Sequence, residues 1–414
     1  MANSYTARRR RNAARERESA EEAKDIGPLP KVANWARRKR CERDLLKYML
    51  TYLRESFPLD FSKDHLDFVA AVQRCILDGG AKAQAMPRGS GKTTIILAAI
   101  TWAQAYGHRR FVVLIAAETE ASAELADDVR IVWETNEKLA EDFPEVAYPV
   151  QRLQGVVQRA KTQTLDGRQT FMRWSGRKLV MPTILVDPND PRADHSVPAT
   201  ADGRHPTKTS GCVLRATGIL ARVRGMKHTD TAGRTIRPDV VLVEDFQTDE
   251  SADSELQCAK RERKIAAGIL GLAGPGKSMA AFATCTVIRF GDAADRLLNR
   301  VIYPRWRGTR CKLVNRWPND IEADGPLWKR YLEIRDEELE QLVDDLADCD
   351  NPHPKATAYY RKNRRKMDAG ADIPWRDRKF AHELSHVEHA VNLRHDNPDS
   401  FDSEYQNEPK DEVA

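Results

Sequence analysis

The sequence lacks several features that would assign it to a class at once. No stretch approaches the roughly 18 uninterrupted apolar residues of a membrane-spanning helix. The seven cysteines form no C-x-x-C pair, so we expect reduced, mostly buried thiols and neither a zinc site nor a disulfide framework. Basic residues outnumber acidic ones only slightly, 67 against 62. A polyanion would therefore be bound by local basic patches and not by overall charge.

The rest of the composition is typical of a globular protein. With 414 residues, 41% of them hydrophobic and 31% charged, the chain can hold one large or two medium domains. Residues 1–24 contain no apolar signal-peptide core, which predicts a cytoplasmic location. They carry the run Arg8 to Arg11. We interpret residues 1–56 as a basic, helical N-terminal arm, for which a solvated helix is favoured over a nucleic-acid site.

Residues 87–94, PRGSGKTT, are the stretch around which the chain is organised. They end in a GK[ST] sequence, and residues 94–100 continue as an apolar helix. Backbone N–H groups of such a glycine-containing loop can surround a polyphosphate at the start of a helix. Lys92 would reach the β- and γ-phosphates, and the Thr93 hydroxyl would hold Mg²⁺. The predicted nucleotide-binding residues are Pro87, Arg88, Gly89, Ser90, Gly91, Lys92, Thr93 and Thr94.

The match to a phosphate-binding loop is incomplete, because Met86 stands where the first glycine of G-x-x-x-x-G-K-[ST] belongs. A chance turn before a helix is the alternative. The run at residues 239–245 favours the loop, since its apolar, β-branched residues 240–243 lead into two carboxylates, Glu244 and Asp245. A buried parallel strand that delivers acids at its carboxyl end can supply a Mg²⁺ ligand and a base that orients water.

The remaining periodicity predicts an α/β fold. Strands are expected at residues 81–86, 111–117, 212–217 and 279–287, a long helix at 119–139, and an excursion from the sheet edge at about 149–208. Residues 57–290 would form the core, and residues 291–414 a helix-rich lid or linker. Before the first strand, Phe61 and His65 are candidates to contact a nucleotide base, with a core phenylalanine and a surface histidine as the alternative. The basic run at 361–366 is a nucleic-acid candidate or one polar helix face.

Together these segments resemble the ATPase part of tailed-phage terminase large subunits, the motors that pump DNA into procapsids. The resemblance is carried by residues 87–94, residues 237–251 (RPDVVLVEDFQTDES), the strand end at 284–286 and the closing FDSEYQNEP at 401–409. It implies a P-loop NTPase of the ASCE, RecA-like class, with a mostly parallel central sheet flanked by helices. It also implies Mg²⁺-dependent ATP hydrolysis.

Further residue roles come from the resemblance alone. Arg88 would sense the γ-phosphate, and Thr284 and Thr286 would occupy the coupling motif. Arg224 is the candidate for the arginine that acts on the neighbouring subunit's nucleotide. Glu244 and Asp245 depart from the family order of Asp then Glu, or a double Asp, so the division between metal ligand and catalytic base stays open.

The implied partners are double-stranded DNA bound without sequence specificity, a portal protein and a terminase small subunit. The implied assembly is a homo-oligomeric ring, with a pentamer among the candidate sizes, docked on a procapsid in the host cytoplasm. Residues 290–414 show no strand-rich segment for the family's nuclease, so nuclease activity is not expected. The alternatives are another P-loop, helicase-like or DNA-translocating ATPase, and a nucleotide-dependent scaffold that hydrolyses weakly.

Overall fold

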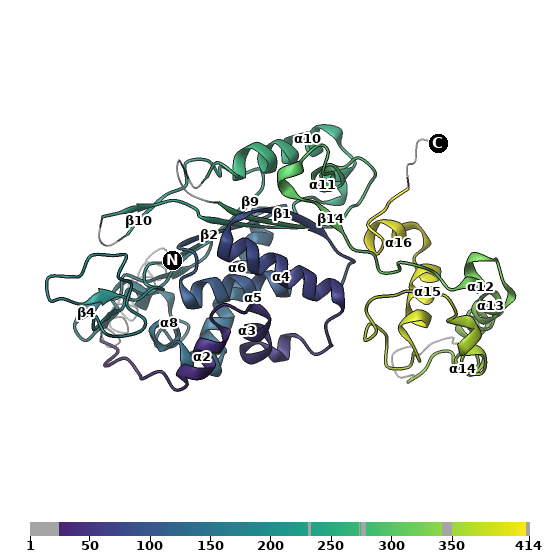
Figure 1. Ribbon diagram of the computed structural model, residues 1–414, viewed down its shortest axis with the longest axis horizontal. Helices are drawn as coiled ribbons and strands as arrows, with labels where there is room; N and C mark the ends of the chain where they lie inside the picture. Colours follow the sequence, from purple (N-terminus) through teal and green to yellow (C-terminus); the bar gives the residue numbers. More distant parts are fainter. Residues whose placement is uncertain (1–24, 231–232, 273, 275–278, 342–349, 411–414) are drawn as a thin grey trace, which may run out of the picture.

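The computed structural model describes residues 25–230, 233–272, 274, 279–341 and 350–410. Its centre is an eight-stranded sheet of order β14-β1-β13-β12-β2-β9-β6-β5 (Figure 1). All neighbours from β14 to β9 are parallel, and β6 and β5 are antiparallel, which confirms a mostly parallel α/β fold. The strands are β1 (Gly80–Ala85), β2 (Phe111–Ala116), β5 (Arg173–Ser175), β6 (Lys178–Val180), β9 (Val213–Gly218), β12 (Val240–Glu244), β13 (Ala280–Cys285) and β14 (Thr309–Arg310).

Helices cover both faces of the sheet, because the central strands are apolar on both sides. Along β12, Val240 and Leu242 face one core, and Val241 and Val243 face the other. The first core is closed by α2 (Trp35–Cys41), α3 (Leu45–Tyr52), α4 (Lys63–Asp78), α5 (Lys92–Tyr106), α6 (Thr119–Thr135), α7 (Glu137–Asp142) and α8 (Pro144–Gln151). The second is closed by α10 (Glu255–Arg263), a π-helical turn (Lys264–Ile269) and α11 (Ala293–Leu298), which lie above the sheet in Figure 1.

Two predicted boundaries differ from the structure. The helix expected to reach residue 139 ends at Thr135, because the side chain of Asn136 accepts a hydrogen bond from the Leu139 N–H (2.9 Å) and starts α7. The boundary expected at 290/291 does not separate two cores. Helix α11 and Trp306 pack against the sheet in the second core, and β14 pairs with β1. The sheet unit therefore extends to about Arg310.

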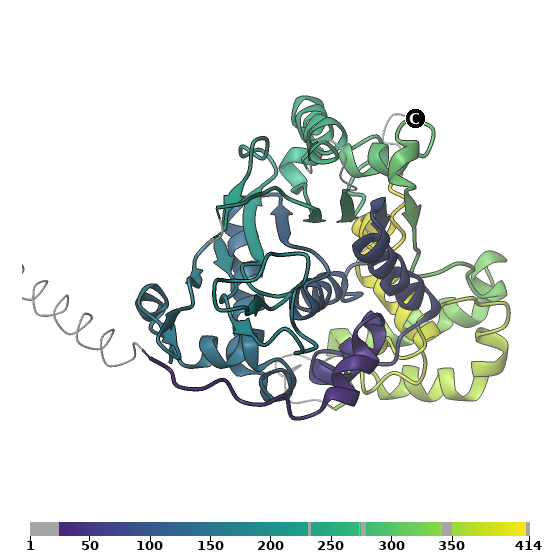
Figure 2. The same ribbon diagram turned by 60° about the vertical axis from the view of Figure 1, so that its left-hand side comes forward.

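The excursion after α8 reaches the sheet edge, as expected. The β5–β6 hairpin pairs with β9, and the excursion also forms two small separate hairpins. These are β3 (Thr164–Leu165) with β4 (Arg168–Gln169), and β7 (Leu185–Val186) with β8 (His205–Pro206). A further short hairpin, β10 (His228–Thr229) with β11 (Thr235–Ile236), precedes β12. Figure 2 shows the face of the molecule that carries this excursion.

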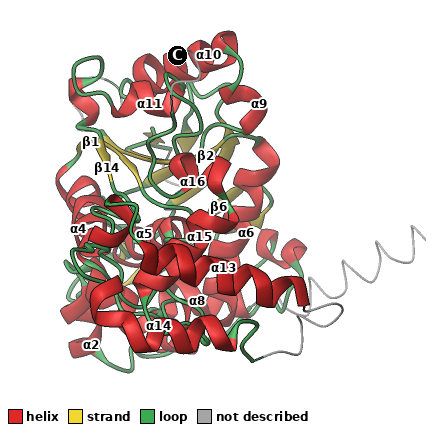
Figure 3. Ribbon diagram, turned by 90° about the vertical axis from the view of Figure 1, so that its right-hand side faces the viewer, coloured by secondary structure: helices red, strands yellow, loops and turns green. Residues whose placement is uncertain are grey.

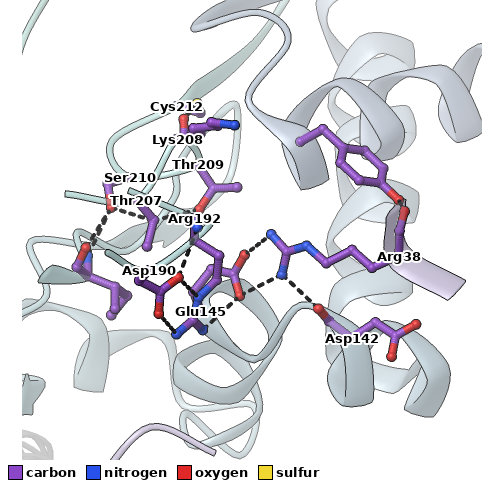
Figure 4. A network of polar contacts seen from close by, with 12 residues as sticks. Arg38, Asp142, Glu145, Asp190, Arg192, Thr207, Lys208, Thr209, Ser210 and Cys212 are labelled. Carbon is purple, nitrogen blue, oxygen red and sulfur yellow. Dashed lines mark hydrogen bonds and ion pairs between the residues drawn. The ribbon is translucent and has the colours of Figure 1, made fainter. Parts of the chain in front are cut away.

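A buried ion network ties the N-terminal helices to this excursion (Figure 4). Arg38 on α2 donates to the Glu145 carboxylate (2.6 Å) and to the Asp142 carbonyl (2.7 Å). Arg192 lies within 3.5 Å of Glu145 and pairs with Asp190 at 2.6 Å. Removing one partner of such a pair leaves a buried charge unpaired, which costs about 3–5 kcal/mol. Helices α2 and α3 thus belong to the core of the sheet unit; the Arg8–Arg11 run lies outside the described residues.

The C-terminal helices pack around a third core of their own. They are α12 (Asn319–Glu322), α13 (Pro326–Gln341), α14 (Pro354–Met367), α15 (His386–Asp396) and α16 (Pro398–Glu404). Trp328, Tyr331 and Tyr360 are buried at its centre, with ring centroids 5.3–5.9 Å apart. Figure 1 shows this unit, which we call the C-terminal module, at one end of the molecule beside the sheet, and in Figure 3 its helices face the viewer.

Two further features bear on the expectations from composition. Five cysteines are free and buried, and Cys311 is half-buried; Cys349 lies outside the described residues. No helix among the described residues is long and apolar enough to cross a membrane.

Candidate nucleotide-binding site

The loop between β1 and α5 has the backbone of a tight, glycine-dependent turn. Gly89 and Gly91 have φ angles of 73° and 72°, which favour glycine over other residues, and Gly91 directly precedes the first residue of α5. His65 supports the turn from α4. Its Nδ1 accepts a hydrogen bond from the Ser62 N–H (3.1 Å), so Nε2 carries the proton and donates to the Ser90 carbonyl (3.0 Å). Burial lowers the pKa of His65, which favours this neutral form.

Lys92 and Thr93, the first two residues of α5, point to the carboxyl ends of neighbouring strands. The Lys92 ammonium donates to the Met86 carbonyl and to the Thr286 hydroxyl, both at 3.0 Å. The Thr93 hydroxyl donates to the Glu244 carboxylate at 2.5 Å. β13 lies between β1 and β12 in a parallel sheet, so the ends of all three strands meet at one edge. This edge joins residues 151 positions apart in the sequence.

Side chains along β12 point alternately to the two faces of the sheet, which explains why Glu244 and not Asp245 accepts the hydrogen bond from Thr93. Glu244 continues the face of Val240 and Leu242, which packs on the side of α5. Glu244 is 8% exposed. Burial raises its pKa to about 7, and the charge of Asp245 adds to the rise, while the Thr93 hydrogen bond and the Lys92 charge lower it. Near neutral pH this carboxyl group can therefore either hold or release a proton.

Asp245 leaves the strand with a strained backbone. Its φ is 32°, in the left-handed region, which costs about 1–2 kcal/mol for a residue with a side chain. Its Oδ1 is buried and has no hydrogen-bond partner among the described residues. Mg²⁺ in nucleotide sites is held by one or two carboxylates together with substrate phosphates and water. The unpaired carboxylate oxygen of Asp245, next in sequence to Glu244, could bind such an ion or the water that attacks the phosphate.

Thr284 and Thr286 at the end of β13 have different surroundings. The Thr284 hydroxyl is fully buried and donates to the Val243 carbonyl at 3.2 Å. Thr286 accepts from Lys92 through its hydroxyl and from the Gln247 amide through its carbonyl (3.2 Å). Gln247 also donates to Asp292 at 2.6 Å, and Asp292 caps α11. A polar chain therefore runs from Lys92 through the predicted Thr286 to Gln247 and Asp292, which sequence reasoning missed. Only the places of these two residues, just after the acids and just before a helix, hinted at a role.

Three other residues predicted for the nucleotide site, Arg88, Phe61 and Arg224, differ in their distance from the loop between β1 and α5. Arg88 directs a 68% exposed side chain to an ion pair with Glu404 of α16. Phe61 is half-buried, with its ring centroid 5.5 Å from that of Phe57 and 5.9 Å from that of His65. Arg224 is exposed after β9, where it lines a cavity of about 720 Å³ with Arg222 and residues of 260–268, and not with the loop. Its role towards a neighbouring subunit stays a prediction.

The C-terminal module closes one side of this site. The Arg88 N–H donates to the Glu404 carbonyl (2.8 Å), and the Val287 N–H donates to the Asn407 side chain (3.3 Å). Thus residues of the closing FDSEYQNEP segment contact the loops that follow β1 and β13. Elsewhere in the module, the basic run at 361–366 lies mainly exposed on α14.

Comparison with known proteins adds no assignment: no protein-family model matches the chain, and no curated protein is similar enough to count as a relative. Among the described residues, no group of three or more His, Cys, Asp or Glu side chains is placed to hold a metal ion.

Proposed function

We propose that the chain is a Mg²⁺-dependent ATPase of the P-loop, ASCE or RecA-like class. The observation that carries this proposal is the 2.5 Å hydrogen bond from Thr93 to Glu244, because it joins the GK[ST] end of the loop to the acid-bearing strand. The strand order supports the class, since one strand, β13, lies between the loop strand and the acid strand, as in RecA-like ATPases.

In the proposed reaction, the loop binds the phosphates, Thr93 and Glu244 bind the metal ion, and Asp245 orients the attacking water. The amides of residues 89–92 bind the phosphates, and Lys92 exchanges its contacts with Met86 and Thr286 for a phosphate oxygen. Thr93 and Glu244 would hold Mg²⁺, which when bound neutralises phosphate charge. Asp245, whose Oδ1 lacks a partner among the described residues, orients the attacking water and accepts its proton.

Within this class we favour a DNA-translocating motor of the terminase type, acting on double-stranded DNA. The closing segment 401–409 supports this choice. It is one of the stretches that resemble terminase large subunits, and its residues Glu404 and Asn407 contact the loops that follow β1 and β13. A portal protein, a small subunit and a ring of identical subunits on a procapsid in the host cytoplasm belong to the same proposal. A helicase-like ATPase and a weakly hydrolysing scaffold are the alternatives.

The test is phosphate release from ATP with and without linear duplex DNA. The wild type should hydrolyse ATP, faster with DNA, and should stop when EDTA removes Mg²⁺. Lys92→Ala should abolish turnover, whereas the matched control Lys63→Ala, an exposed lysine on α4, should retain it. Full activity of Lys92→Ala, or activity in EDTA, would contradict the ATPase assignment. Nucleotide binding without phosphate release would favour the scaffold, and DNA strand separation the helicase.

A further inference from the structure

A segment of the C-terminal module lies directly against the phosphate-binding loop. The Trp375 indole donates to the Asp60 carbonyl (2.9 Å), and the Asp60 N–H donates back to the Asp377 carboxylate (3.0 Å). The Trp375 ring meets the ring of His65 edge-on, with centroids 4.5 Å apart. Because His65 also holds the Ser90 carbonyl, the segment is anchored to a residue that supports the loop itself.

Arg378 extends from this segment to the loop. Its guanidinium carbon lies 5.7 Å from the ring centroid of Trp375 and 5.3 Å from that of Tyr405. One terminal nitrogen, Nη2, is 3.5 Å from the position that a Cβ atom would occupy on Gly89. The guanidinium therefore lies close to Gly89 of the loop.

Among the described residues, no carboxylate forms an ion pair with Arg378, and the electrostatic neighbour that affects its pKa is Tyr405. Its other terminal nitrogen, Nη1, is buried and has no hydrogen-bond partner among the described residues. Burial lowers the pKa of Arg378, which records how unfavourable the charged form is in these surroundings. The aromatic rings compensate for part of this cost through cation–π contact. A half-buried guanidinium that lacks a carboxylate partner among the described residues and lies beside a glycine-containing turn can donate hydrogen bonds to a phosphate oxygen.

We propose that Arg378 is a phosphate-binding residue of the nucleotide site, supplied in cis by the C-terminal module. The inference rests on the proposed ATPase function and adds a ligand that no sequence motif indicated. Arginine suits the task because its planar group can stack on aromatic rings and still donate two hydrogen bonds to phosphate. Occupation of the site would then be reported to the module directly, through a residue bound to both.

The test compares Arg378→Gln with Arg376→Gln, an exposed arginine two residues away. Calorimetric titration would give Kd values for the Mg²⁺ complex of ATPγS, for ADP and for AMP. Loss of a hydrogen bond to a charged phosphate corresponds to about 10–100-fold in affinity. Arg378→Gln should weaken ATPγS binding by about this factor and AMP binding by less than about threefold, and Arg376→Gln should bind all three as the wild type does.

Two results would overturn the inference. In one, Arg378→Gln binds ATPγS as the wild type does; in the other, all three nucleotides lose the same factor, as expected for a residue that only holds the module in place. If Arg378→Gln fails to fold, Arg378→Lys replaces it, and its loss should again grow with the number of phosphates. Failure of the ATPase proposal looks different, because wild-type binding would then be absent or unaffected by Lys92→Ala.

Discussion

Replacing Glu244 by glutamine should change how the stability of the protein depends on pH. The carboxyl group is 8% exposed and lies beside Asp245, and its pKa is raised from 4.5 to about 7. A group that binds a proton more tightly in the folded state destabilises that state as pH rises between the two pKa values. The free energy of unfolding of the wild type should therefore fall between pH 4.5 and pH 7 relative to that of Glu244→Gln.

The magnitude follows from the size of the shift. One pKa unit corresponds to about 1.4 kcal/mol, so a rise from 4.5 to about 7 gives at most roughly 3 kcal/mol. Glutamine keeps the volume of the side chain and an oxygen that can accept the Thr93 hydrogen bond, so packing changes little. Without metal, the stability difference between the two proteins should thus grow by up to this amount from pH 4.5 to pH 8, with Glu244→Gln gaining.

Urea denaturation in EDTA at several pH values measures this difference, and groups common to both proteins cancel. Glu250→Gln, an exposed position on α9 (Asp249–Ala252), is the control and should show no such trend. Addition of Mg²⁺ at pH 8 should stabilise the wild type and leave Glu244→Gln unchanged, because only the ionised carboxylate attracts the ion. A pH-independent stability difference between the two proteins would refute the assignment of a raised pKa to the buried Glu244 carboxyl group beside Asp245.

Three further outcomes are expected. Glu404→Gln should change the free energy of unfolding by less than about 1 kcal/mol, as expected for an exposed ion pair. The same variant should lower the KM for ATP, because it frees the Arg88 side chain to contact phosphate. An unchanged KM would argue against Arg88 as a phosphate contact. Arg224→Ala should reduce kcat by about 10³-fold or more, and mixing it with Lys92→Ala subunits should restore activity; an inactive mixture would contradict action across a subunit boundary. Binding to duplex DNA, measured by fluorescence anisotropy, should weaken at least about tenfold between 50 and 200 mM salt; a flat response would contradict several phosphate contacts.

The elements that carry the site followed from local patterns. The apolar runs at 111–116 and 240–244 could be only buried strands, and parallel strands bring their carboxyl ends to one edge, so the approach of the acids to the loop was predictable. The contact between Thr93 and Glu244 then follows from the alternation of side chains along β12.

Other parts of the fold and of the candidate site could not be predicted from local sequence patterns. β14 has only two residues, too few for a period, and its pairing with β1 could not be read from them. Arg88 and Glu404 lie 316 residues apart and are joined by the folding of a separate helical core. Arg378 was indistinguishable from its neighbours Arg376 and Lys379 by composition alone. What singles it out is the pair of rings beside it and the glycine it faces, both products of tertiary packing.

We expect Thr93 and Glu244 to bind one metal ion together with the nucleotide. Titration with Mn²⁺ in the presence of ADP, followed by electron paramagnetic resonance, tests this expectation through a double-mutant cycle of Thr93→Val and Glu244→Gln. Each single variant should weaken Mn²⁺ binding at least about tenfold, and the double variant should bind little more weakly than the weaker single variant, because losses at residues with a shared partner are not additive. Unchanged Mn²⁺ binding in either single variant, or fully additive losses, would contradict this expectation.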